Sequence, residues 1–283
     1  MKIIVANWKM NKNFDEADEW LNGFFAGYAK NPTKLQDVEI VLCPPAVLAE
    51  YIDSELMEEV FKDLEVFAKS ENKTIEDFSE EELSQILIEQ RAIMLGAQDC
   101  HYEKSGSFTG DVSAAVLRQS GCEYVILGHS ERRSGHSEAS NIVRKKVEAA
   151  IKEQMVPIVC VGESAEIRTQ GQHSDFVLNQ IFESLPQNLE IPKLIIAYEP
   201  VWSIGTGVTP TEKEIHDMLR VIRIFCEKNF SSHVKEFFLL YGGSTTSQNS
   251  KEILLIDGID GLLVGKASLD AEEFFKICLS SAS

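Results

Sequence analysis

The chain has 283 residues, of which 44% are hydrophobic and 25% charged, and its net charge is −18. This composition supports a sizeable globular core, and the length suits one large α/β barrel or two ordinary domains. The negative charge argues against nucleic acid or an anionic membrane surface as a partner. An anionic substrate would therefore need a local cationic site that works against the overall field.

Cysteine usage and hydropathy indicate the compartment. The six cysteines are widely spaced, without a CxxC pair or a Cys/His spacing typical of zinc. Small buried thiols in a reducing compartment are the simplest interpretation. No apolar run approaches the roughly 18 residues of a membrane span, and the first residues read as a strand without a signal-peptide pattern. We therefore expect a cytoplasmic protein that binds neither a metal ion nor a membrane.

Eight short apolar runs, most of them followed by proline, glycine or polar residues, predict eight strands. In chain order they cover 2–6, 39–43, 93–98, 124–127, 157–161, 194–198, 237–241 and 261–264. Helical patterns lie between them, the clearest at 14–29, 137–154, 175–185, 211–229 and 269–279. This alternation predicts parallel strands with crossover helices, and eight strands favour a closed (β/α)8 barrel over an open doubly wound sheet. We expect one such domain over residues 1–283.

An acidic segment at 55–91 departs from this alternation between the second and third strands. It holds twelve acidic and four basic residues. Apolar residues at helical spacing, followed by a capping-box pattern at 79–82, predict an extended second helix and an additional short one. Because the segment precedes a strand, we expect the additional helix near the amino-terminal face of the barrel. It is either a solvated decoration or a surface for a partner.

The sequence IIAYEPVWSIGTG at 195–207 is the richest stretch for function. A buried-strand pattern ends at the carboxylate of Glu199, and Pro200 stops the strand because proline has no N–H for a sheet. A loop with two glycines follows. A general base would be placed here if a lid had to close over it. On its own, however, the stretch is also compatible with a strand-end glutamate in a surface turn.

Other polar residues follow other predicted strands. Lys9 follows the first strand, His129 the fourth, and glycine-rich turns follow the seventh and eighth. In a parallel barrel these positions share one mouth. A base, an imidazole and a cation around one pocket suit proton abstraction beside a carbonyl, and backbone N–H groups of glycine-rich turns suit a phosphate. Taken singly, His129 could be a packed histidine and Lys9 a surface lysine.

Six segments resemble those of the triosephosphate isomerases, in order from one end of the chain to the other. They are NWKMN at 7–11, GHSERR at 128–133, CVGE at 160–163, AYEPVWSIGTG at 197–207, YGGS at 241–244 and LVGKASL at 263–269. The resemblance implies a (β/α)8 enzyme of glycolysis and gluconeogenesis that interconverts D-glyceraldehyde 3-phosphate and dihydroxyacetone phosphate. It also implies a homodimer that needs neither a metal nor an organic cofactor.

The resemblance further implies a role for each matched residue. Glu199 would move the proton between the two carbons, while a neutral His129 donates to the carbonyl oxygen and stabilises the enediolate. Lys9 would attract the phosphate ester, and the loop at 200–207 would close to exclude water from the enediolate. Other implied residues are the substrate-binding Asn7, the nearby carboxylate Glu131, the phosphate-binding N–H groups of Gly205, Ser244, Gly265 and Lys266, and Thr109 of a dimer loop at 101–110. From its position alone, Glu131 could equally be a glutamate at a helix start.

Two residues depart from the family pattern. Lys266 stands where a second glycine is usual, and it can still offer its backbone N–H unless φ must be positive there. Asp99 stands where an asparagine is usual, beside the dimer loop, and exchanges a hydrogen-bond donor for a charge.

Two other functions stay open at this point. A catalytically silent barrel could bind phosphate or act as a scaffold through its acidic insertion, although the intact set of Lys9, His129 and Glu199 argues against it. A Schiff-base aldolase would need a lysine within a strand near the sixth position, where this chain has Glu199 at the strand end.

Overall fold

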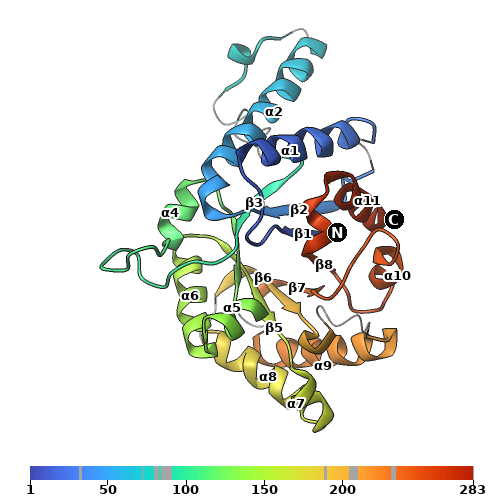
Figure 1. The fold of residues 1–283 in the computed structure, drawn as a ribbon. Coiled ribbons are helices and arrows are strands. Elements are labelled where there is room, and N and C mark those ends of the chain that lie inside the picture. Colours follow the sequence, from blue (N-terminus) through green and yellow to red (C-terminus); the bar gives the residue numbers. More distant parts are fainter. Residues whose placement is uncertain are drawn as a thin grey trace.

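The computed structural model describes residues 1–31, 34–71, 73–79, 83, 91–187, 190–203, 210–230 and 234–282. Eight parallel strands form a closed barrel in sequence order (Figure 1). Ile4 of the first strand is paired with both Ile40 and Leu262, which closes the ring. The (β/α)8 prediction is therefore confirmed. The strands are β1 Lys2–Asn7, β2 Val38–Cys43, β3 Met94–Ala97, β4 Tyr124–Leu127, β5 Val156–Val161, β6 Ile191–Tyr198, β7 Val234–Tyr241 and β8 Gly261–Val264.

Helices surround this barrel (Figure 1). The longer ones are α1 Phe14–Tyr28, α2 Ala49–Ser70, α6 Ser140–Lys152, α8 His173–Ser184, α9 Glu212–Phe230 and α11 Ala271–Ser281. Shorter ones are α4 Ala114–Gln119, α5 Ser130–Gly135, α7 Ala165–Thr169 and α10 Ser250–Leu254. Periodicity predicted the longer helices within a few residues, but the shorter ones have too few turns to show it. Among the described helices, none is long and apolar enough to cross a bilayer.

Apolar side chains fill two layers of core. One layer lies inside the barrel and includes Val5, Ile126 and Ile195. The other lies between strands and helices, where Phe24 of α1 packs against Phe274 of α11. Because both faces of each strand are covered, the strands read in the sequence as continuous apolar runs.

The strands β6 and β7 begin three residues earlier than predicted, at Ile191 and Val234. Their first residues include charged ones, which a search for apolar runs leaves out. Lys193 of β6 forms an ion pair with Glu39 of β2, and its Nζ lies 3.2 Å from Tyr124 Oη. These charges therefore belong to a polar cluster at the amino end of the barrel.

The first part of the acidic segment, 55–70, belongs to α2. This helix runs for 22 residues and projects outward from the rest of the molecule (Figure 1). Its buried stripe includes Leu56, Val60 and Leu64, as predicted, but Phe61 and Phe67 are 44% and 39% exposed. A short 3-10 turn at Ile75–Asp77 follows and was not predicted. The additional helix expected at 79–90 falls almost entirely outside the described residues.

Candidate active site

A cavity of about 610 Å³ opens at the carboxyl ends of the strands. Residues that follow β1, β4, β6, β7 and β8 line it, so the expected convergence of strand ends is found. The predicted residues among them are Asn7, Lys9, His129, Glu199, Ser244, Gly265 and Lys266. Glu131 and Thr109 do not line this cavity, and Gly205 lies outside the described residues.

Glu199 follows β6 directly and is only 2% exposed. Its backbone N–H donates to Val161 O at 2.8 Å. A Cβ on Gly242 would come within 2.9 Å of Glu199 Cγ, and one on Gly162 within 1.7 Å of Glu199 O. Both glycines are therefore needed for the backbone and side chain of Glu199 to fit at this strand end.

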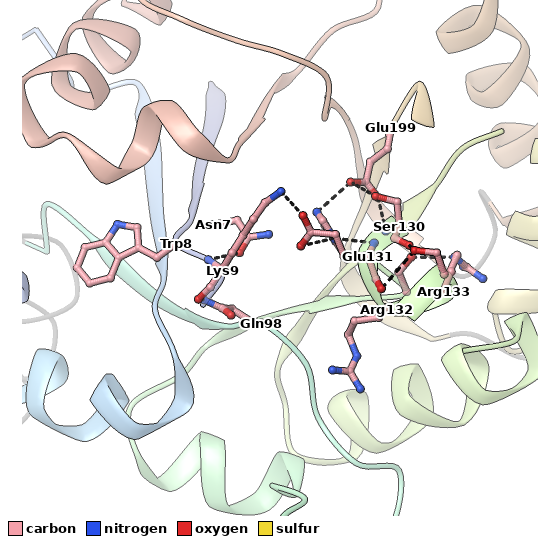
Figure 2. A network of polar contacts seen from close by, with 12 residues as sticks. Asn7, Trp8, Lys9, Gln98, Ser130, Glu131, Arg132, Arg133 and Glu199 are labelled. Atoms are coloured by element: carbon pink, nitrogen blue, oxygen red, sulfur yellow. Dashed lines mark hydrogen bonds and ion pairs between the residues drawn. The ribbon is translucent and has the colours of Figure 1, made fainter. Parts of the chain in front are cut away.

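The Glu199 carboxylate is held by the start of α5. Its Oε2 accepts a hydrogen bond from Ser130 N at 2.9 Å, and its Oε1 accepts one from Ser130 Oγ at 3.2 Å (Figure 2). His129 Nε2 lies 3.0 Å from Oε1. The carboxylate thus touches the imidazole that would act with it. The contact with Ser130 was not predicted, although this serine directly follows His129 in the matched segment.

His129 caps α5 and is 7% exposed. Its Nδ1 accepts a hydrogen bond from Glu131 N at 3.3 Å. An accepting ring nitrogen carries no proton, so the neutral imidazole carries its proton on Nε2. That proton points toward Glu199, on the side of the cavity. The backbone of α5 therefore selects the tautomer that can donate to a substrate oxygen.

Lys9 adopts a positive φ of 54°, which is uncommon for a residue other than glycine. Its N–H donates to Asn7 Oδ1 at 3.0 Å and its carbonyl accepts from Gln98 Nε2 at 2.8 Å. Its Nζ lies 2.6 Å from Glu131 Oε1 (Figure 2). A Cβ on Gly265 would lie 3.2 Å from Lys9 Cε, so this glycine leaves room for the lysine along the rim.

Lys266 lines the same cavity, and its backbone φ is not positive. The lysine therefore adopts an ordinary backbone conformation where the family usually has glycine, and its backbone N–H remains a usable donor at that position.

The first residues after β6 are tied to the loop after β5. Trp202 Nε1 donates to Glu163 Oε1 at 2.8 Å, and Tyr198 Oη donates to the same oxygen at 3.1 Å. Arg168 forms an ion pair with Glu163 at 2.9 Å and lies over the Trp202 ring at 4.5 Å. This arrangement fixes one end of the predicted lid. The sequence matched Glu163 only as part of a segment, without a role.

Asp99 has partners of opposite charge within the chain. Lys146 Nζ lies 2.7 Å from Asp99 Oδ1, and Arg132 Nη2 lies 2.8 Å from Oδ2. Both cations also bind Glu138, so two carboxylates face two cations. Burial raises the pKa of Asp99, and Lys146 opposes that shift. The charge introduced at this position is therefore compensated locally.

No cluster of three or more His, Cys, Asp or Glu side chains in the described part of the chain is arranged to hold a metal ion. The donors and acceptors of the cavity include the carboxylate of Glu199, the imidazole of His129 and the ammonium groups of Lys9 and Lys266. Together they suit acid–base chemistry on a small anion.

The fold and the site define a class: a (β/α)8 protein whose carboxyl-end cavity is lined by a buried carboxylate, an imidazole and a lysine. The family model for triosephosphate isomerase matches residues 2–74 and 77–281. The triosephosphate isomerase of Aquifex aeolicus (strain VF5) is 38% identical and that of Mycoplasmopsis pulmonis (strain UAB CTIP) 34% identical. Both alignments cover 99% of this chain, with 99% and 98% of those proteins.

A solved structure agrees with these sequence comparisons. The crystal structure of triosephosphate isomerase from Bartonella henselae is 31% identical and superimposes with a TM-score of 0.79. That match covers 100% of this chain and 99% of the other. The chain belongs to the triosephosphate isomerase family.

Proposed function

We propose that this protein interconverts D-glyceraldehyde 3-phosphate and dihydroxyacetone phosphate, as a step of glycolysis and gluconeogenesis. The observation that carries the proposal is the 3.0 Å contact between His129 Nε2 and Glu199 Oε1 at the wall of a cavity that Lys9 also lines. A base and a hydrogen-bond donor side by side suit transfer of a proton between adjacent carbons.

Glu199 removes a proton from the carbon next to the carbonyl and returns it to the former carbonyl carbon. Ser130 donates hydrogen bonds to both of its oxygens, and His129 Nε2 contacts Oε1. The start of α5 therefore orients the carboxylate beside the imidazole. His129 donates its Nε2 proton as a hydrogen bond to the carbonyl oxygen, which stabilises the negative charge of the enediolate. The imidazole also passes the hydroxyl proton to the former carbonyl oxygen, so that the carbonyl and hydroxyl groups exchange places.

Lys9 provides the positive charge for the phosphate ester, despite the chain's net charge of −18. Its ion pair with Glu131 holds the ammonium group at the cavity rim, with the two side chains 31% and 57% exposed. Backbone N–H groups of Ser244, Gly265 and Lys266, together with Gly205 outside the described residues, bind the phosphate oxygens. Asn7 contributes by holding the Lys9 backbone.

The loop after Pro200 closes over the bound substrate. Its contact between Trp202 and Glu163 fixes the end next to Glu199, and the remainder of the loop, 204–207, lies outside the described residues. A closed loop excludes water and strengthens the electrostatic interactions inside the site. It thereby keeps the enediolate from losing its phosphate.

A coupled assay tests this function. Purified protein is given D-glyceraldehyde 3-phosphate, and formation of dihydroxyacetone phosphate is followed through an NADH-dependent reductase. We expect rapid turnover that persists in excess EDTA, because the acid–base groups are side chains. Absence of turnover in the purified, folded protein would contradict the proposal and favour a silent phosphate-binding barrel.

We also propose that the protein is a homodimer. Apolar side chains shortly after the ends of β1 and β2 are exposed: Met10 at 96%, Phe14 at 51% and Val47 at 81%. The loop at 101–110 extends beyond the barrel (Figure 1) and carries Phe108, 39% exposed, next to Thr109. A second copy would cover this surface. Light scattering should give twice the 31.7 kDa of one chain, and a single-chain mass would contradict it.

We further propose a cytoplasmic location, supported by the six cysteines, all of which are buried and unpaired. We also propose a single domain with the segment 55–91 inserted in it, since none of the described residues of that segment lines the cavity. Deleting its distal part, 71–90, with a short linker should leave the isomerase rate unchanged. A large loss of rate in a folded deletion variant would instead tie the segment to the site.

A further inference from the structure

Two consecutive arginines of α5 have different surroundings. Arg132 forms ion pairs with Asp99 at 2.8 Å and Glu138 at 2.9 Å. Arg133 has no such ion pair with any described carboxylate and donates to neutral oxygens. Its acceptors are Gly128 O at 2.8 Å, Cys160 O at 3.1 Å, Ser184 Oγ at 3.1 Å and Ser140 Oγ at 3.2 Å.

Of the two backbone oxygens that Arg133 binds, one belongs to the residue before His129 and the other to the strand beside the one that ends at Glu199. Gly128 directly precedes His129, and Cys160 lies on β5, which is paired with β6 ahead of Glu199. Gly128 has a φ of +68°, and a Cβ there would come within 2.7 Å of Arg133 Nη2. One planar guanidinium therefore holds the carboxyl ends of β4 and β5 together.

Arg133 also lies on a different side of Glu199 from the substrate. A second cavity, of about 170 Å³, is lined by Arg133, Ser130 and Glu199 among others. Glu199 lines both cavities, whereas Lys9 lines only the larger one and Arg133 only the smaller one. The base is therefore placed between a cation on the substrate side and a cation behind it.

Three ionisable groups of the described residues interact with Glu199. His129 Nε2 lies 3.0 Å from its Oε1, and the Arg133 guanidinium and the Cys160 thiol interact with its charge. Burial lowers the pKa of Arg133, and Cys160, Glu138 and Glu199 act in the opposite direction. A guanidinium remains charged at neutral pH in any protein environment.

We propose that Arg133 is a positioning residue for the isomerisation, which holds His129 and Glu199 in register and places a positive charge behind the carboxylate. It does not line the substrate cavity, so it acts through these two residues. Misplacing reacting groups by about 1 Å costs about 10²-fold in rate, and a nearby cation favours an ionised carboxylate. The inference rests on the proposed isomerase activity.

Two substitutions separate geometry from charge. Arg133→Gln removes both the planar set of guanidinium N–H donors and the positive charge. Arg133→Lys removes that set of donors but keeps the charge. We expect kcat to fall about 10- to 100-fold in both variants, with KM within about threefold of the wild-type value. The acidic limb of kcat/KM against pH should move to higher pH only in Arg133→Gln. The control Arg132→Gln should lower the melting temperature without moving that limb.

Wild-type kcat and an unmoved acidic limb in folded Arg133→Gln would overturn the proposal. If neither Arg133 variant folds, the double variant Ser140→Ala, Ser184→Ala retains the guanidinium with half of its contacts. We expect its kcat to fall about threefold or more, and an unchanged kcat would overturn the positioning role. Wild-type turnover in the same assay distinguishes failure of this inference from failure of the proposed function.

Discussion

The two ends of the barrel interior both hold charged side chains, and at the carboxyl end these side chains line a cavity. At the amino end, Lys193 pairs with Glu39, and Tyr124 Oη donates to the same carboxylate at 2.7 Å. Burial, and then the charge of Glu39, raises the pKa of Tyr124, which keeps its hydroxyl protonated as a donor. The Lys193 and Glu39 side chains are only 13% and 16% exposed. These groups satisfy one another.

At the carboxyl end, the charged groups face a cavity of about 610 Å³. Glu199 and His129 are as buried as the amino-end cluster, yet they line open space large enough for a small substrate. Strain is also found here, since Lys9 has a positive φ. The comparison separates charge that stabilises the fold from charge that is kept available for a ligand. Substitutions at the two ends should therefore affect different quantities.

Removing the base should have the largest effect. Glu199→Gln keeps the size of the side chain but cannot accept the proton, so we expect kcat to fall about 10²–10⁴-fold. Steady-state kinetics with D-glyceraldehyde 3-phosphate measures this. The matched control Glu39→Gln makes the same change at the amino end and should keep the wild-type kcat. A similar loss of kcat in both variants would contradict the view that only the charged groups at the carboxyl end of the barrel serve the reaction.

Removing the rim cation should have the next largest effect. Lys9→Met eliminates a charge-assisted contact with the phosphate, worth about 1.5–3 kcal/mol, so kcat/KM should fall about 10- to 100-fold. The nearby Lys12, which lies over the Trp8 ring and does not line the cavity, provides the control. Lys12→Met should change kcat/KM by less than about threefold. Equal losses in the two variants would indicate a general charge effect.

Breaking the amino-end cluster should change stability alone. Lys193→Met leaves the carboxylate of Glu39 without its cation, and we expect the free energy of unfolding to fall by about 1–3 kcal/mol. Urea denaturation measures the loss, while kcat should be unchanged. The exposed pair of Lys213 with Asp217 is the control, because Lys213→Met should leave the denaturation midpoint close to that of the wild type. A lowered kcat in Lys193→Met would couple the two ends.

A partly exposed rim carboxylate should have the smallest effect, visible in its pH dependence. Thr211 N–H and then Arg168 lower the pKa of Glu214 from 4.5 to about 2. Since the folded-state pKa is the lower one, the stabilisation is present above pH 4.5 and is lost as the pH falls toward 2. Glu214→Gln should cost less than about 1 kcal/mol at pH 7, and denaturation curves near pH 2 should coincide with wild type. A difference that persists at pH 2 would contradict this origin.

The same contrast explains which features of the fold and the site could be predicted from the sequence. Apolar runs predicted all eight strands because both faces of each are buried, and strand ends in a closed barrel must meet, so Lys9, His129 and Glu199 were placed together. The early starts of β6 and β7 were missed because their first residues include charged ones, Lys193 in β6 and Lys235 and Glu236 in β7. Which atoms touch depends on side-chain orientation, which no spacing encodes.

That limit applies most clearly to contacts between distant segments. Ser130 holds Glu199, Glu163 holds Trp202, and Arg133 links the ends of β4 and β5. Each contact joins residues that lie close only after the barrel has closed. The motifs contained all of these residues, but their roles required the three-dimensional structure.

Hydrogen exchange at carbon during turnover tests the central claim most directly. Dihydroxyacetone phosphate is incubated with the protein in D₂O, and NMR follows deuterium at the carbon that loses its proton. Proton transfer through the Glu199 carboxylate predicts stereospecific incorporation of one deuteron with wild-type protein and loss of this exchange in Glu199→Gln. Exchange at the wild-type rate in Glu199→Gln, or none with the wild-type protein, would contradict it.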